Sequence, residues 1–164
     1  QAHYFNGDVG YKRFTPAGPD HAQVAACAGI ADYIDMLCDH HTGPETNPAA
    51  RAAFVHDLMR AHEVKLLQPV LEIVKDRNDV RLIGPADANL RAPTIALQLK
   101  TPAEPVAAEL ADKGIMAGGG DFYALRALKA LGIDPDAGVL RLSFTHYTSE
   151  NEVNKLLTAL DEVL

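Results

Sequence analysis

The chain has 164 residues, 48% hydrophobic and 23% charged, with 15 basic side chains against 22 acidic ones and a formal net charge of −7. This composition is typical of one folded domain or slightly more, and it excludes disordered, collagen-like and coiled-coil classes. A net negative charge without a Lys/Arg cluster argues against nucleic acid as a partner. The apolar runs are too short to cross a bilayer and no basic leader follows Gln1, so we expect a cytoplasmic protein with no membrane partner.

Residues 1–19 are rich in Gly, Pro and aromatic side chains without a regular period, which predicts an irregular segment. Apolar residues then recur at helical spacing from Asp20, a good N-cap, and this pattern predicts a helix that ends before Asp39. Cys27 and Cys38 share one face of this helix, about 16 Å apart along its axis. They are therefore too distant to form a disulfide, and we expect both to pack as small hydrophobic side chains.

A second, longer helix is predicted after the Gly- and Pro-containing break at residues 42–48. Asn47 followed by Pro48 is a helix-start signal, with proline at the first helical position. The helical period continues through Leu66, but Pro69 removes one backbone donor and is expected to kink or interrupt the helix before residues 71–75.

Beyond this helix, short apolar runs alternate with helical segments, which predicts an α/β fold class with a small α+β domain. We expect strands at residues 80–83, 93–99, 114–117 and 139–144. Two helix starts are marked by capping boxes, at residues 101–104 with Thr101 as the cap and at residues 149–152 with Ser149 as the cap.

The glycine run at residues 118–120 lies between an expected strand and an expected helix that carries Leu125, Leu128 and Leu131. A glycine-rich turn at a helix N-terminus can bring backbone N–H groups close to a phosphate. The spacing here matches neither the dinucleotide fingerprint nor the Walker motif. A connection without a ligand is therefore the favoured interpretation.

Arg141 lies in a run with the alternation of a strand, which places Leu140, Leu142 and Phe144 on one face. Arg141 is then expected on the opposite face, where a guanidinium on a rigid element can bind a carboxylate through two hydrogen bonds. The competing interpretation is a solvated arginine on an exposed strand face.

Residues 38–41, Cys-Asp-His-His, bring together side chains that can ligate a metal. Their spacing fits no recognised zinc pattern, so solvated histidines at a helix end are favoured over a metal site. His146 has no Ser or Cys nucleophile that the sequence assigns to it, so the sequence supports no catalytic triad.

Taken in order, these motifs resemble the C-terminal part of class V aminotransferases, the fold-type I pyridoxal phosphate enzymes that include the cysteine desulfurases. Residues 139–153 are similar to that family's strand, turn and acidic-capped last helix. Residues 114–117 resemble the strand that leads to the substrate-facing loop, and residues 14–20 resemble a Phe-Glu-x-Gly-Thr-Pro-Asn turn. Residues 62–67 and 91–94 fit best with the cysteine desulfurase-like branch.

The resemblance implies a domain organisation. Residues 1–45 would complete the large cofactor-binding domain, residues 46–77 would form a bridging helix, and residues 78–164 would form the small C-terminal domain. It also implies a homodimer with pyridoxal 5'-phosphate as cofactor and a small amino-acid substrate.

The resemblance further implies roles for individual residues. Arg141 aligns with the arginine that holds the substrate carboxylate, and Asp121, Tyr123 and His146 would complete the substrate site. Thr15, Ala17 and Gly18 would face the cofactor phosphate of the partner subunit, with Gly18 at the position of a threonine in the family.

Two departures from the family qualify this expectation. The lysine that would bond to the cofactor belongs upstream of Gln1, so the N-terminal portion of the same enzyme is an expected partner and this chain alone is expected to be inactive. The sequence Asp121-Phe122-Tyr123 replaces the persulfide-forming cysteine of desulfurases. Transamination, desulfuration, elimination and racemisation stay open, as do a noncatalytic interaction or dimerisation domain and a metal-binding module at residues 39–41.

Overall fold

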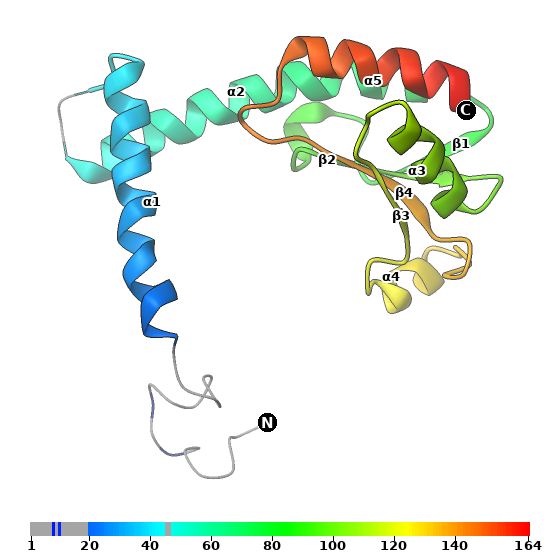
Figure 1. Cartoon of the computed structure of the whole chain (residues 1–164), viewed down its shortest axis with the longest axis horizontal. Helices are drawn as coiled ribbons and strands as arrows, with labels where there is room; N and C mark the ends of the chain where they lie inside the picture. The colour runs from blue at the N-terminus through cyan, green and yellow to red at the C-terminus, as the bar shows by residue number, and fades with distance from the viewer. Residues whose placement is uncertain (1–7, 9, 11–19, 45–46) are drawn as a thin grey trace. The chain divides into compact units, whose positions relative to one another are not determined.

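The computed structural model of the chain describes residues 8, 10, 20–44 and 47–164 (Figure 1). Most of the segment expected to be irregular, residues 1–19, therefore lies outside the described residues. The chain divides into two compact units, Gln1–Asp57 and Leu58–Leu164. The division falls inside helix α2 (Pro48–Lys75), and the domain bounds implied by the family resemblance stay a prediction.

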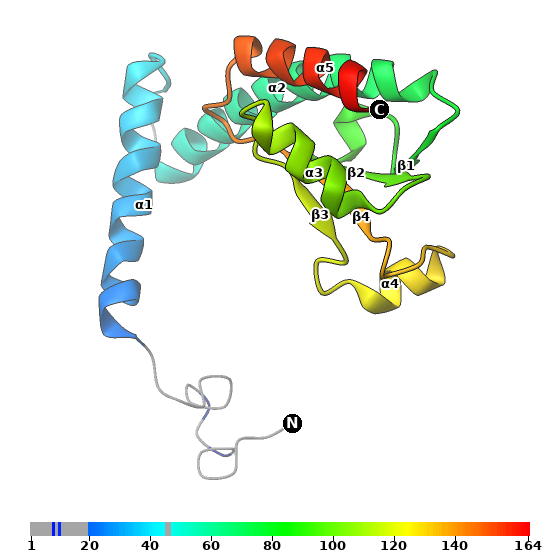
Figure 2. The ribbon, with the colours of Figure 1, turned by 45° about the vertical axis from the view of Figure 1, so that its right-hand side comes forward.

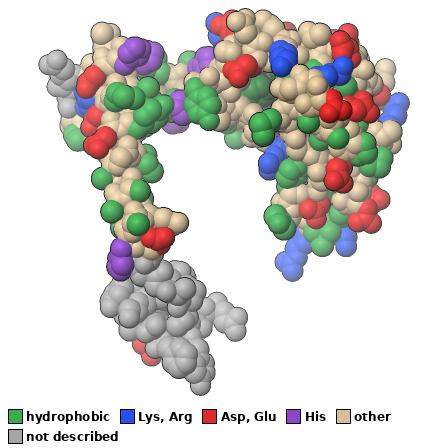
Figure 3. Space-filling model, viewed as in Figure 1, with side chains coloured by type: hydrophobic (Ala, Val, Ile, Leu, Met, Phe, Trp, Pro, Cys, Tyr) green, Lys and Arg blue, Asp and Glu red, His purple; other side chains and the backbone are tan. Residues whose placement is uncertain are grey.

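Helix α1 (His21–His40) begins at the predicted cap, because the Asp20 carboxylate accepts the N–H groups of Ala22 and Gln23. It ends at His40, slightly later than predicted. Cys38 is buried as expected, but Cys27 is exposed, so the packing prediction is wrong for that thiol. Cys27 lies within residues 21–33 of α1, which are all exposed, and Figure 3 shows hydrophobic side chains along this helix.

Arg51 and Gly43 tie α1 to the start of α2 within the first unit. Arg51 donates through Nε to Asp35 at 2.6 Å and through Nη2 to Asp39 at 2.7 Å. These hydrogen bonds, that to Asp35 first, raise the pKa of the Arg51 guanidinium above its ordinary value. A Cβ at Gly43 would lie 2.4 Å from Cys38 Sγ, so only glycine fits this close connection.

Helix α2 starts where the sequence predicts, with Asn47 Oδ1 accepting the Ala50 N–H at 3.0 Å. It then runs through Pro69 to Lys75, so of the predicted kink or interruption at Pro69 the interruption does not occur. Pro69 removes one hydrogen bond of the helix, but Leu66, Leu67 and Val70 beside it are buried in the core. Their packing holds the helical backbone across the missing bond, because tertiary burial supplies most of a helix's stability.

The second unit contains an antiparallel four-stranded sheet in the order β1-β2-β4-β3. Its strands are β1 (Val80–Ile83), β2 (Thr94–Leu99), β3 (Gly118–Gly120) and β4 (Val139–Ser143). The prediction is confirmed for β1 and is one residue too long for β2 and β4. It is wrong for β3, which occupies the glycine run itself and pairs with β4 from Val139 to Arg141.

Three helices cover one face of this sheet, which we call the α5 face. They are the C-terminal half of α2, α3 (Ala103–Asp112) and α5 (Glu150–Val163), as Figures 1 and 2 show. Their apolar side chains form the main core with Ile95 and Leu97 of β2 and Leu140 and Leu142 of β4. The α/β class with a small helix-packed sheet is thereby confirmed.

The opposite face, which we call the α4 face, carries a smaller apolar cluster. Helix α4 (Leu125–Ala130) covers part of it, and Leu128, Ile133 and Val139 are buried there. A short 3-10 helix, η2 (Ala88–Leu90), lies in the connection between β1 and β2. None of the helices in the described part of the chain is both long enough and apolar enough to span a membrane.

The two predicted capping boxes have different outcomes. That of α5 is confirmed, because Ser149 Oγ accepts the Glu152 N–H while the Glu152 carboxylate accepts the Ser149 N–H. That of α3 is wrong: Pro102 occupies the cap position and makes no side-chain cap bond. The Ala103 N–H donates instead to the Ala137 carbonyl at 2.9 Å, so a neighbouring loop satisfies the helix start.

Candidate functional site

The α4 face of the sheet presents Arg141 at the centre of β4. Its partners across the sheet are Ala96 of β2 and Gly118 of β3, which are both small. Leu140 and Leu142 on either side of it in sequence are buried toward the α5 face, whereas Arg141 is exposed. The alternation predicted from the sequence is thus confirmed, and the guanidinium lies on the face away from the main core.

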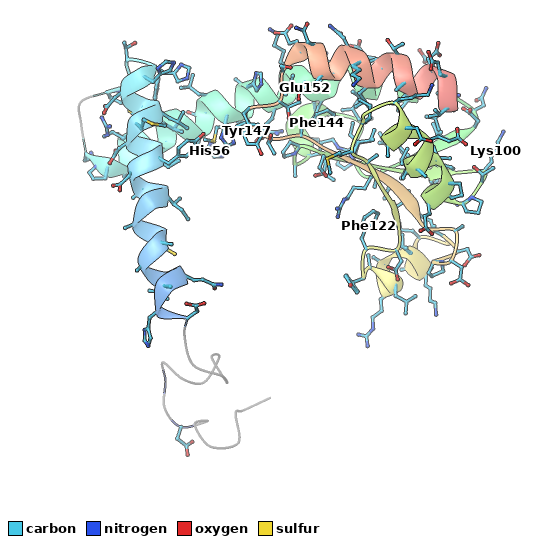
Figure 4. The ribbon with its side chains drawn as sticks, in the orientation of Figure 1. His56, Lys100, Phe122, Phe144, Tyr147 and Glu152 are labelled. Carbon is cyan, nitrogen blue, oxygen red and sulfur yellow. The ribbon has the colours of Figure 1, made fainter. Side chains whose placement is uncertain are left out.

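The aromatic ring of Phe122 lies against the Arg141 guanidinium. The distance from Arg141 Cζ to the ring centroid is 4.0 Å, which is within the range of a cation–π contact. Figure 4 shows Phe122 on the α4 side of the sheet and Phe144 toward α5. Phe122 also packs against the small apolar cluster of the α4 face, so the ring that contacts the guanidinium is itself supported by buried side chains.

Arg141 differs from most arginines of the described residues in its hydrogen bonds. Five of them donate to oxygen atoms of the chain: Arg51, Arg60, Arg77, Arg81 and Arg91. Within the described part of the chain, the ring of Phe122 is the only group that engages the Arg141 guanidinium, and the guanidinium N–H groups have no oxygen partner. A guanidinium has five N–H donors in a planar fork that matches a carboxylate or phosphate. Arg141 can therefore bind an external anion without breaking an internal bond.

The turn between β3 and α4 brings Asp121 and Tyr123 to the same side of the sheet as Phe122. The Asp121 carboxylate accepts the Tyr123 N–H at 3.0 Å, and its carbonyl accepts the Ala124 N–H at 2.8 Å. Phe122 and Tyr123 have φ angles of 50° and 59°, which are costly for residues with side chains. Asp121 thus shapes the turn, and the fully exposed Tyr123 stands at its tip. Their roles in substrate binding stay predictions.

His146 lies in the turn between β4 and α5 and not on the strand. Its ring makes an edge-to-face contact with Tyr147, with the centroids 5.1 Å apart. In Figure 4, Tyr147 lies near α2, well separated from Phe122. In the same turn, the Thr148 carbonyl lies 2.7 Å from Nε2 of His62. The contribution of His146 to a substrate site stays a prediction.

The described residues do not support two other candidate sites, the glycine-rich phosphate loop and the metal site at residues 39–41. Gly118–Gly120 is a paired strand and not a turn, and α4 begins only at Leu125, so the glycine run forms no phosphate-binding helix start. Asp39 is ion-paired with Arg51, and His40 contacts the ring of His41. Among the described residues no group of three or more His, Cys, Asp or Glu side chains is placed to hold a metal ion.

Sequence reasoning missed Phe122 and Ala96 as parts of the Arg141 site. Ala96 becomes a neighbour only through the pairing of β2 with β4, which a single sequence does not specify. Phe122 reaches the guanidinium only because the turn adopts left-handed backbone angles. An available signal was the pair Gly118 and Phe122, since a glycine in a strand often marks the close approach of another group.

Comparisons with known proteins agree with this fold. A sequence profile of the aminotransferase class-V family matches residues 52–156. Aminotransferase-like protein FGM3 of Gibberella zeae is 28% identical over 113 residues, covering 66% of this chain and 28% of that protein. A cysteine desulfurase structure from Thermococcus onnurineus matches with a TM-score of 0.57 and 30% identity, over 71% of this chain and 29% of that one. A NifS-like protein from Rickettsia africae, at 17% identity and a TM-score of 0.55, shares the fold over 71% of this chain and 32% of its own.

The small helix-covered sheet and these structural matches define part of a fold-type I domain, the class of the pyridoxal phosphate-dependent transferases. The chain belongs to the aminotransferase class-V family, whose profile matches more than half of it. It spans less than a third of the length of the relatives reported above.

The family implies pyridoxal phosphate, but the described residues do not fit a complete site for this cofactor. Its covalent anchor is a lysine with a desolvated amine, whereas the lysines of the described residues are all exposed. Lys65 and Lys113 are moreover ion-paired with Glu150 and Glu162. The residues assigned to the cofactor phosphate, Thr15, Ala17 and Gly18, lie outside the described residues. The guanidinium of Arg141, by contrast, is free of oxygen partners among the described residues and is open to an external anion.

Proposed function

We propose that this chain supplies the substrate-binding, C-terminal part of a pyridoxal phosphate-dependent class V enzyme that acts on an amino acid. The observation that carries the proposal is Arg141, an arginine on a rigid strand whose hydrogen-bond donors have no oxygen partner within the described residues. Family membership supports it, because the cofactor serves this class as an electron sink for amino-acid chemistry.

In this proposal Arg141 binds the substrate carboxylate through two parallel N–H donors. The turn that carries Asp121 and Tyr123 closes one side of the site, and His146 approaches from the β4–α5 turn. Thr15, Ala17 and Gly18 face the cofactor phosphate of the other subunit in a homodimer. The N-terminal portion of the same enzyme supplies the anchoring lysine, and the enzyme acts in the cytoplasm.

The positions of the cysteines bear on which reaction we propose. The chain has only two, Cys27 and Cys38, and both lie in α1. The turn at residues 121–123 therefore carries no thiol that could hold a sulfur atom. We accordingly favour transamination, racemisation or elimination over desulfuration through a persulfide in this turn.

Replacing Arg141 with alanine tests the proposal. Arg141→Ala should weaken amino-acid binding by roughly 1.5 to 3 kcal/mol, since a hydrogen bond to a charged group is lost. The free energy of unfolding should change little, because the side chain is exposed and not part of the main core. Calorimetric titration with L-alanine, in the complete enzyme, measures the first effect and urea denaturation the second.

Arg126→Ala is the matched control, because Arg126 is also exposed and also makes no hydrogen bond to the described residues. Both variants remove one positive charge. Equal weakening by both would show a general electrostatic effect and no site at Arg141, and unchanged affinity in Arg141→Ala would reject the assignment.

A noncatalytic interaction domain is the second candidate. It is favoured by the exposed apolar side chains of α1, with Val24 60%, Ile30 64% and Met36 56% exposed. Mixing the chain and its N-terminal portion with pyridoxal phosphate separates the two candidates. Visible absorbance from bound cofactor supports the enzyme, whereas a stable complex that stays colourless supports the interaction domain.

A further inference from the structure

We propose that Phe122 is a positioning residue that fixes the plane of the Arg141 guanidinium and so presents its edge to a carboxylate. This inference rests on the proposed function, because it assigns Phe122 a role in the same anion site. It goes beyond that function in giving the turn at residues 121–123 a role of its own.

The geometry around Arg141 makes the ring of Phe122 its principal restraint. An arginine side chain has many rotamers, and ordering it opposes binding unless the free protein already holds it in place. The partners of Arg141 on the neighbouring strands, Ala96 and Gly118, carry no long side chain that could do so. Arg141 Cζ lies over the ring of Phe122, 4.0 Å from its centroid. Stacking of this kind leaves the N–H groups at the edge free for two parallel hydrogen bonds.

Gly118 is what allows the ring to reach this position. A Cβ added at Gly118 would lie 2.9 Å from both Cε1 and Cζ of Phe122, which is closer than real Cβ contacts. Gly118 is also the direct partner of Arg141 across β3 and β4. The missing side chain therefore creates the space that Phe122 fills beside the guanidinium.

The turn that aims the ring is held in a costly conformation. Phe122 and Tyr123 both adopt positive φ angles, and such strain persists where the surrounding structure imposes it, often at functional sites. Asp121 imposes it by accepting the Tyr123 N–H through its carboxylate. The packing of Phe122 against the cluster of Leu128, Ile133 and Val139 further restrains its ring.

Side-chain NMR of the full chain tests the contact without the cofactor. The Arg141 Hδ and Nε–Hε resonances should be shifted by the ring current of Phe122 in the wild type. That shift should be lost in Phe122→Leu and in Gly118→Ala, which displaces the ring, and kept in Phe122→Tyr. The Arg81 resonances are the internal control, because Arg81 is bound by Gln98 and the Leu131 carbonyl and should not change.

Titration of the same variants with L-alanine, each as part of the complete enzyme, tests the consequence for binding. Phe122→Leu should weaken binding roughly three- to tenfold, the effect of losing a cation–π contact of ordinary strength. Phe122→Tyr should restore wild-type affinity, which a merely structural loss would not predict. Circular dichroism and urea denaturation identify any variant that fails to fold, and Phe122→Tyr and Phe122→Leu are then compared at equal stability.

The outcomes separate this inference from the proposed function. If Arg141→Ala weakens L-alanine binding as predicted while Phe122→Leu binds like the wild type, the positioning role is wrong and the carboxylate site stands. If the Arg141 resonances show no ring-current shift in the wild type, the positioning role is wrong as well. If Arg141→Ala does not change the affinity of the complete enzyme for L-alanine, the proposed function fails, and the role of Phe122 in that site fails with it.

Discussion

Gly119 shows how a single atom decides where a strand can form. A Cβ at this position would lie 2.5 Å from the backbone carbon and oxygen of Ala103, at the start of α3. Glycine is therefore required at this position for β3 to lie against that helix. Arg91 is a second residue that holds the sheet together. It donates hydrogen bonds to the carbonyls of Ile83, Pro85 and Thr94 and so links the end of β1 to the start of β2. Burial lowers its pKa.

Gly119→Ala should reduce the free energy of unfolding of the second unit by about 1 to 3 kcal/mol, the usual cost of overpacking. Urea denaturation followed by circular dichroism measures the change. Gly29→Ala is a control for the added methyl group, because a Cβ there meets nothing within 4 Å. Inside helix α1 this change should leave stability unchanged or raise it, since alanine is the better helix former. A Gly119→Ala protein as stable as the wild type would show that β3 and α3 are not in close contact.

At the scale of elements, α5 is the helix whose start is best defined by its own sequence. Ser149 and Glu152 cap each other, and these bonds, with the backbone N–H of Ser149 first, lower the pKa of the Glu152 carboxyl below its ordinary value of 4.5. A lowered folded-state pKa means that the carboxylate stabilises the protein fully above the unfolded-state pKa. The contribution is lost as the pH falls through the lower folded-state pKa.

Ser149→Ala should therefore cost about 1 kcal/mol of stability at neutral pH, the usual value for a lost N-cap. The comparison of wild type with Glu152→Gln isolates the charged part: the two should differ most at neutral pH and converge in acid, as Glu152 becomes protonated. Urea midpoints measured across that pH range check this. A constant difference between these two proteins at all pH values would contradict the assigned hydrogen bonds.

Whether an interaction is local or distant in the sequence explains which features could be predicted from it. The start of α1 at Asp20, the cap of α5 and the outward face of Arg141 follow from residues close together in the chain, and the structure confirms them. The start of α3 was wrong because it depends on the distant Ala137 carbonyl. The contact of Phe122 with Arg141 was missed because it needs both a left-handed turn and a strand pairing. Thr15, Ala17 and Gly18 remain predictions from the family resemblance.

At the scale of the whole molecule, the second unit is a packed domain, and the anion site that we propose lies on the α4 face of its sheet. Its core joins three helices to one face of the sheet and leaves Arg141 on the other. On the face seen in Figure 3, basic side chains of the described residues stand among acidic ones and form no continuous basic surface. A single guanidinium in such surroundings suits one small carboxylate better than an extended polyanion.

The most direct measurement is a crystal structure of the protein with a bound amino acid such as L-alanine. We expect both carboxylate oxygens to lie within hydrogen-bond distance of two Arg141 nitrogens, with the ring of Phe122 still stacked on the guanidinium face. An amino acid bound elsewhere, while the Arg141 guanidinium contacts only solvent, would contradict the assignment of Arg141 as the carboxylate-binding residue.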